Sequence, residues 1–224
     1  MRIMIDFHYS NTWADPSNQK TPAAWAGLNL HELASEVEAH TKETLKLLKD
    51  NSIDVEWVQV GNETNSGMLH PAGKITGSAD DFAVLANKGY EAVKSIYPEA
   101  KVIIHRSEGH KENECKWLFT HLKNSKVKYD IIGLSLYPVW WNGHTSVFIL
   151  YKGVIEILRY GCDCRLVTVD VHRAYNGKIN KVKGTHIINA RRMVFVLVRK
   201  EYGIEVAHAL TKHLLSKVGA CVDD

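Results

Sequence analysis

Short apolar segments alternate along this chain with longer segments in which apolar residues recur every three or four positions. We predict strands at 2–7, 55–61, 101–105, 130–135 and 165–170, and helices at 30–49, 79–97, 112–123 and 146–160. The clearest helical face carries Leu30, Leu33, Ala34, Val37, Thr41, Leu45 and Leu48. Strands that alternate with helices favour an α/β fold with a parallel sheet. A length of 224 residues suits one domain or an incomplete larger one.

The C-terminal part of the chain has a less regular pattern. Residues 187–200 fit a helix, although 194–198 is equally typical of a buried strand. A short strand at 204–207 and a final helix at 209–218 follow. We therefore expect a single domain, in which 1–172 forms the recognisable part and 173–224 a divergent, mostly helical C-terminal segment.

Composition and charge argue against several classes of partner. The net charge of +3 is small, and no basic run is interleaved with aromatic residues, so we expect no nucleic-acid partner. No apolar run approaches the roughly 20 residues of a membrane span, and no export signal is visible after Met1. The four cysteines have neither metal-finger spacing nor a dense disulfide pattern.

The predicted strand at 55–61 ends abruptly in an amide and a carboxylate, Asn62 and Glu63. Enzymes built on α/β barrels keep their chemistry at the carboxyl ends of the strands. The pattern therefore predicts that Glu63 is catalytic. The alternative is a surface carboxylate that caps the next loop, which is the commoner environment of glutamate in general.

Three long motifs occur in order along the chain. They are Asp6-Phe7-His8-Tyr9-Ser10-Asn11-Thr12-Trp13-Ala14-Asp15-Pro16 with Gln19 and Thr21-Pro22-Ala23-Ala24-Trp25, then Trp57-Val58-Gln59-Val60-Gly61-Asn62-Glu63-Thr64-Asn65-Ser66-Gly67-Met68-Leu69, then Ile131-Ile132-Gly133-Leu134-Ser135-Leu136-Tyr137-Pro138-Val139-Trp140. These segments resemble the third, fourth and sixth strands of glycoside hydrolase family 53, the arabinogalactan endo-β-1,4-galactanases. The resemblance covers roughly residues 3–170.

This resemblance implies a (β/α)8 barrel of the TIM type, of which the chain begins at the third strand. Five to six of the eight strands are recognisable, and an open barrel exposes parallel edge strands that invite self-association. The implied activity is cleavage of β-1,4-galactan, a side chain of pectin, by a retaining double displacement without a cofactor. The resemblance also implies an extracellular location.

The resemblance assigns roles to particular residues. Glu63 matches the acid/base, and Asp170 matches the nucleophile, where the family has glutamate. The side chain of aspartate is shorter by one carbon–carbon bond, about 1.5 Å, and misplacement on that scale can cost on the order of 100-fold in rate. The substrate-binding residues implied are His8, Trp13, Asn62, Asn65, His105, Tyr137 and Trp140, with Asn62 bonding the sugar 2-hydroxyl.

Aromatic residues near strand ends have two interpretations. Trp13, Tyr137, Trp140 and Trp141 are candidates for stacking on galactose rings, whereas we expect Trp57 and Trp117 to lie in the core.

Two other hypotheses remain open. A truncated, non-catalytic relic would at most bind galactan weakly through its aromatic residues. A metal-dependent barrel hydrolase is suggested by Asp6, His8 and His105 at or after strand ends. No His-x-His pair occurs, and His110, His144 and His172 fall in predicted loops. We therefore expect no metal site, and we expect His8 and His105 to orient carboxylates or bond substrate hydroxyls.

Overall fold

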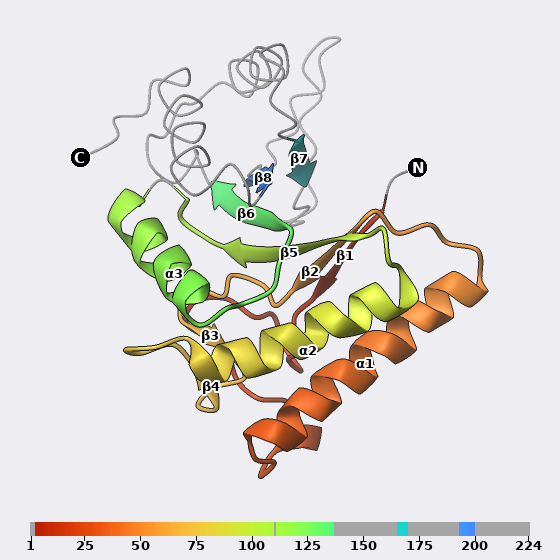
Figure 1. Ribbon diagram of the computed structural model, residues 1–224, viewed down its shortest axis with the longest axis horizontal. Coiled ribbons are helices and arrows are strands. Elements are labelled where there is room, and N and C mark those ends of the chain that lie inside the picture. The colour runs from red at the N-terminus through yellow and green to blue at the C-terminus, as the bar shows by residue number, and fades with distance from the viewer. Residues whose placement is uncertain (1–2, 110, 137–164, 170–192, 200–224) are drawn as a thin grey trace, which may run out of the picture.

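The computed structural model describes residues 3–109, 111–136, 165–169 and 193–199 (Figure 1). Within these ranges the predicted strands are confirmed as β1 (Met4–Phe7), β2 (Trp57–Val60), β5 (Lys101–Arg106), β6 (Ile131–Leu136) and β7 (Arg165–Val169). The helices are α1 (Leu30–Asp50), α2 (Asp80–Ile96) and α3 (Glu112–Asn124), with a short 3-10 helix η1 (Ala23–Trp25). The helix predicted at 146–160 lies outside the described residues.

The first four long strands form a parallel sheet in the order β1, β2, β5, β6. The register places Met4 beside Trp57, Trp57 beside Lys101 and Ile103 beside Ile131. All four strands therefore end at the same edge of the sheet, and that edge carries the Asn62-Glu63 pair. Helices α1 and α2 pack side by side against the same face of this sheet (Figure 1). This arrangement is part of an α/β barrel.

The sheet continues beyond β6 in an unexpected way. Strand β8 (Met193–Arg199) lies between β6 and β7 and runs antiparallel to both. The strand interpretation of 194–198 is thus right, and the helix interpretation of 187–200 is wrong over these residues. A run of β-branched and aromatic residues favours a strand that is paired on both edges. The rest of 173–224 lies outside the described residues.

Helix α1 is defined by a strong start and a clear apolar face. The Asn29 side chain accepts from the backbone N–H groups of His31 and Glu32, and the Glu32 carboxylate accepts from the Asn29 N–H. This reciprocal capping box satisfies amides that the helix itself leaves free. Five of the seven residues on the predicted face of α1 are buried, Leu33, Ala34, Val37, Thr41 and Leu45, and the terminal Leu30 and Leu48 are partly buried.

Helix α2 approaches β2 closely. A Cβ atom at Gly89 would lie 2.7 Å from Val60 Cγ1, so that glycine is the residue that fits there. Ser78 precedes the helix as predicted, and its hydroxyl accepts from the Asp80 N–H at 3.0 Å.

The two tryptophans predicted for the core behave differently. Trp57 is buried, which confirms that prediction. Trp117 is 41% exposed, so its prediction is wrong. The apolar face of α3 is formed by Cys115, Leu118, Phe119 and Leu122, and Trp117 lies about 100° around the helix from Leu118. Its ring instead packs against His121, with centroids 4.4 Å apart.

None of the helices in the described ranges combines the length and apolar character needed to cross a membrane.

Candidate active site

A chain of polar side chains crosses the carboxyl ends of four neighbouring strands. Gln59 Nε2 on β2 donates to Asp6 Oδ1 on β1 at 2.6 Å and to Asn62 Oδ1 at 3.1 Å. Asn62 Oδ1 lies 3.0 Å from His105 Nδ1 on β5, and His105 Nε2 lies 2.8 Å from Ser135 Oγ on β6. Each of the four strands contributes at least one of these polar side chains. The parallel register of the sheet therefore brings them together.

Glu63 occupies a tight turn at the centre of this edge. Its side chain is buried, and its φ of 48° lies in the left-handed region that non-glycine residues seldom adopt. The Glu63 N–H donates to His105 Nδ1 at 3.0 Å. The N–H and the hydroxyl of Thr64 both donate to the His105 carbonyl, each at 2.9 Å. The turn that carries Glu63 is therefore fastened to the end of β5.

His105 is a neutral imidazole with a defined tautomer. A backbone amide always carries its hydrogen, so His105 Nδ1 is the acceptor for Glu63, and the ring hydrogen is on Nε2, from which it points to Ser135 Oγ. In this tautomer Asn62 Oδ1, 3.0 Å from Nδ1, is a close neighbour and not a hydrogen-bond partner of the ring. Burial lowers the pKa of His105 to about 3, and the nearby His8 adds a smaller effect in the same direction. A proton on Nδ1 would compete with the Glu63 N–H for the same position. The imidazole therefore holds the backbone N–H of Glu63 without carrying charge.

Asn62 is held on both atoms of its amide. Its Nδ2 donates to the Ala14 carbonyl at 2.8 Å, and its Oδ1 accepts from Gln59. The second hydrogen on Nδ2 is a further donor. A contact from Asn62 to a sugar hydroxyl stays a prediction.

His8 and Trp13 lie beside each other after β1. His8 Nδ1 accepts from the Ala14 N–H at 3.0 Å, so His8 Nε2 carries the hydrogen that faces Asp6 Oδ2 at 3.3 Å. The Trp13 ring meets the His8 ring at an angle of 61°, with centroids 4.7 Å apart. Because Trp13 is 61% exposed, its ring is free to receive an apolar face of a ligand.

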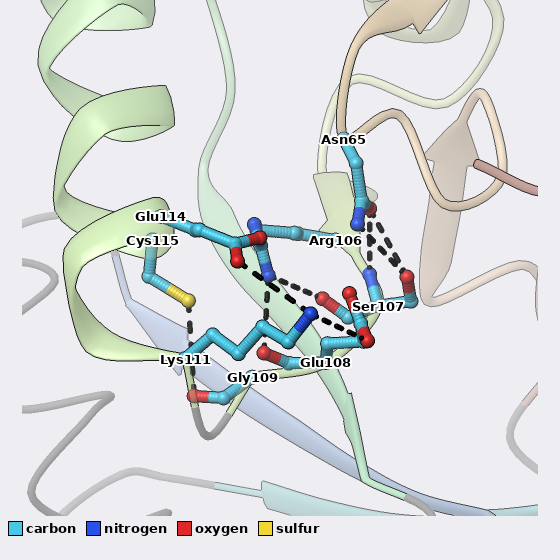
Figure 2. A network of polar contacts seen from close by, with 8 residues as sticks. All are labelled: Asn65, Arg106, Ser107, Glu108, Gly109, Lys111, Glu114 and Cys115. Carbon is cyan, nitrogen blue, oxygen red and sulfur yellow. Dashed lines mark hydrogen bonds and ion pairs between the residues drawn. The ribbon is translucent and has the colours of Figure 1, made fainter. Parts of the chain in front are cut away.

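Asn65 connects the loop after β2 with the loop after β5 (Figure 2). Its Oδ1 accepts from the Ser107 N–H at 2.9 Å, and its Nδ2 donates to Ser107 Oγ at 3.0 Å. Both polar atoms of the Asn65 amide are therefore hydrogen-bonded to Ser107. The predicted contact of Asn65 with substrate stays a prediction, and its observed contacts are structural.

The segment from β5 to α3 is held by a buried guanidinium (Figure 2). Arg106 Nη1 donates to the carbonyls of Ser107 and Glu108 at 2.6 and 3.0 Å, and Nη2 binds the Glu114 carboxylate. Lys111 Nζ lies 2.9 Å from Glu108 Oε1. This network fixes the loop on which Asn65 is anchored.

Several predicted site residues lie outside the described residues: Asp170, Tyr137, Trp140 and Trp141. Of the residues that are described, the structure brings Glu63, Asn62 and His105 together, and places His8 and Trp13 in the segment that follows the neighbouring strand β1. The predicted sites did not include Gln59 or Ser135. Gln59 is the single polar residue in the strand Trp57–Val60, and a lone amide in a buried strand is the signal that would have identified it. Within the described ranges, no three His, Cys, Asp or Glu side chains are grouped closely enough to hold a metal ion.

The family model described as Glycosyl hydrolase family 53 matches residues 1–170. The chain belongs to this family. The predicted resemblance to glycoside hydrolase family 53 is thereby confirmed, and Glu63 lies within the matched region.

Individual relatives also show this similarity. The chain is 32% identical over 177 residues to a probable arabinogalactan endo-β-1,4-galactanase A of Neosartorya fischeri, covering 76% of this chain and 49% of the relative. It is 34% identical over 142 residues to an endo-β-1,4-galactanase of Bacillus subtilis, covering 62% and 32%. An uncharacterized protein of Niallia circulans is 40% identical over 150 residues, covering 64% and 41%. The chain thus spans about half, or less, of these relatives.

Solved family 53 structures agree with the observed fold. The catalytic domain from Ignisphaera aggregans matches with a TM-score of 0.57 and 39% identity, covering 61% of this chain and 38% of that one. A structure from a study of two fungal β-1,4-galactanases matches with a TM-score of 0.58 and 30% identity, covering 70% and 49%. The barrel type predicted from the sequence is confirmed, and the parallel strands β1, β2, β5 and β6 form part of such a barrel.

Proposed function

We propose that this chain is a β-1,4-galactan-cleaving glycosidase in which Glu63 is the general acid/base. One observation carries the proposal: a buried glutamate at the carboxyl end of β2 is held in a left-handed turn by the neutral His105. A carboxyl in such a position is suited to protonate a leaving oxygen. Family membership and the names of the galactanase relatives support galactan as the substrate.

The proposed reaction is a retaining double displacement. Glu63 protonates the glycosidic oxygen while a second carboxylate, for which we propose Asp170, attacks the anomeric carbon. Glu63 then takes a proton from the water that releases the glycosyl enzyme. Such pairs work at a separation of about 5 to 5.5 Å. No cofactor is needed for this chemistry.

We further propose that the sugar chain contacts Trp13, His8 and the Asn62 amide, and that the protein acts outside the cell on pectin side chains. The edge-on pair of His8 and the exposed Trp13 supports a stacking surface next to Glu63. Self-association through the outer edge of β1 is part of the same proposal, because within the described residues β1 is paired only with β2.

Release of reducing ends from β-1,4-galactan tests the function. We expect activity from the unaltered chain, retained in EDTA, and its loss in Glu63→Gln, which keeps the size of the side chain but removes the titrating oxygen. Glu36→Gln, on the α1 helix, is the matched control and should retain activity. A chain that binds galactan but never releases reducing ends would support the non-catalytic relic, and loss of activity in EDTA would support a metal-dependent hydrolase.

A further inference from the structure

The turn at Glu63 needs support from both sides of its backbone. Gly61 has a φ of 82° and Glu63 a φ of 48°, so the chain reverses sharply within three residues. A glutamate in the left-handed region is strained, and such conformations persist only where surrounding contacts enforce them. His105 holds the N–H groups of Glu63 and Thr64. The Glu63 carbonyl accepts from the Asn65 N–H at 2.7 Å, and the Asn62 carbonyl is held by a residue outside the turn.

That residue is Gln19, which lies more than forty positions earlier in the chain. Gln19 Nε2 donates to the Asn62 carbonyl at 2.8 Å and lies 3.3 Å from the Glu63 carbonyl. The same nitrogen lies 3.1 Å from the Asp15 carbonyl. One NH2 group with two hydrogens thus faces three carbonyl oxygens, so one hydrogen is shared. Because Gln19 is buried, water does not readily replace these contacts.

Gln19 is itself anchored at its backbone. Its carbonyl accepts from the His70 N–H at 2.6 Å, and the next residue but one, Thr21, donates through its hydroxyl to the His70 carbonyl at 3.0 Å. The loop after β1 is therefore fixed to the loop after β2 at two places, one at the turn and one beyond it. Because the Gln19 backbone is anchored in this way, its side chain can hold the Glu63 turn in a fixed position relative to the end of the sheet.

We propose that Gln19 is a positioning residue for Glu63: its amide holds the carbonyl side of the turn, opposite His105, and so sets the place from which the carboxyl gives its proton. This inference rests on the proposed function for its catalytic consequence. Its structural half, that Gln19 keeps the Glu63 turn closed, stands independently of activity.

The test uses the full chain and the variants Gln19→Met and Gln19→Asn. Methionine is close to glutamine in length and has no donor, while asparagine keeps the amide but places it about 1.5 Å short. Asn18→Ala is the matched control, because its amide also donates within this loop, to Thr12 Oγ1 and the Trp13 carbonyl, but makes no contact with 62–63.

The first measurement is amide hydrogen exchange in residues 61–65. We expect exchange at least about tenfold faster in Gln19→Met, a smaller increase in Gln19→Asn and no change in Asn18→Ala, with α1 unchanged in all as the internal reference for folding. Wild-type exchange rates in 61–65 in a folded Gln19 variant would overturn the inference. If Gln19→Met fails to fold, Gln19→Asn decides.

The second measurement compares two leaving groups. Cleavage of galactan expels a sugar alkoxide that needs a proton, whereas a dinitrophenyl β-galactobioside expels a group that does not. In Gln19→Met we expect kcat/KM, which reports the step that expels the leaving group, to fall by about 100-fold on galactan, with a change of less than about threefold on the activated substrate. Equal losses on both would overturn the positioning role. An unaltered chain inactive on both substrates would refute the proposed function, and hydrogen exchange would still decide whether Gln19 holds the turn.

Discussion

The buried imidazole of His105 makes the stability of this protein depend on pH in a defined way. The ordinary pKa of histidine is about 6.5, and burial lowers that of His105 to about 3. Between about pH 3 and pH 6.5 this histidine is therefore protonated in the unfolded chain and neutral in the folded chain. The stabilising contribution of the neutral ring is therefore complete above pH 6.5 and is lost as the pH falls toward 3.

The size of the effect follows from the two pKa values. From pH 7 to pH 5 the unfolded state gains about 2 kcal/mol from protonation of this one ring, while the folded state gains almost nothing. In His105→Gln this titration is absent. The difference in unfolding free energy between the unaltered chain and His105→Gln should therefore shrink by about 2 kcal/mol over that interval.

Urea denaturation at pH 5, 6 and 7 measures this difference, because contributions from all other titrating groups are common to both proteins. His31→Gln, at an exposed position on the first turn of α1, is the matched control for the replacement of a histidine by glutamine. Parallel curves for His105→Gln would show that the imidazole is not buried in its neutral form, and the assignment of its tautomer would fail with it.

Further perturbations test the packing around the site. Gly89→Ala should destabilise by about 1–3 kcal/mol in thermal or urea unfolding, because its Cβ would lie 2.7 Å from Val60 Cγ1, whereas Gly77→Ala, with no atom within 4 Å, should have little effect. Thr41→Val should cost about 1–3 kcal/mol by leaving the buried Tyr9 hydroxyl without its partner at 2.7 Å. Tyr9→Phe should then cost less in the Thr41→Val background than alone, and additive losses would contradict the contact. In analytical ultracentrifugation the chain 1–224 should sediment as assemblies larger than a monomer. Met4→Pro removes a backbone N–H donor from the unpaired side of β1 and should reduce the fraction of these assemblies. The control Met4→Leu keeps that donor and should leave the fraction unchanged. A monodisperse monomer at all concentrations would refute self-association.

Most elements of the fold were predictable from the local spacing of apolar residues. The apolar spacing of residues 30–49 predicts both the extent of α1 and its buried face, because helix burial follows from a repeat that is visible within one turn. Trp117 shows the limit of that reasoning. Its bulk suggests burial, but its angular position on α3 places it outside the face formed by Leu118 and Leu122.

The candidate site was predictable only in part. Glu63 and Asn62 are visible because a strand ends on them, and His105 because it ends another. Gln19 and Gln59 both act through partners more than forty positions away, Asn62 for Gln19 and Asp6 for Gln59, and the partner of Gln19 is a backbone carbonyl. Every residue type has a backbone carbonyl, so the sequence does not show which carbonyl will accept a hydrogen bond. The position of β8 between β6 and β7 likewise depends on which strand edges are available for pairing. The local sequence pattern of a strand does not contain that information.

The polar chain from Asp6 to Ser135 has a consequence for the order in which the protein folds. Its contacts between strands join residues 53, 43 and 30 positions apart, and none of these can form within a single helix or loop. Closing each connection costs chain entropy before any contact is gained. Helix α1, with its own capping box, is able to form early, whereas the turn at Glu63 reaches its observed geometry only after β1, β2, β5 and β6 have all aligned. A nicked chain would therefore lose the geometry of this turn before it loses helix α1.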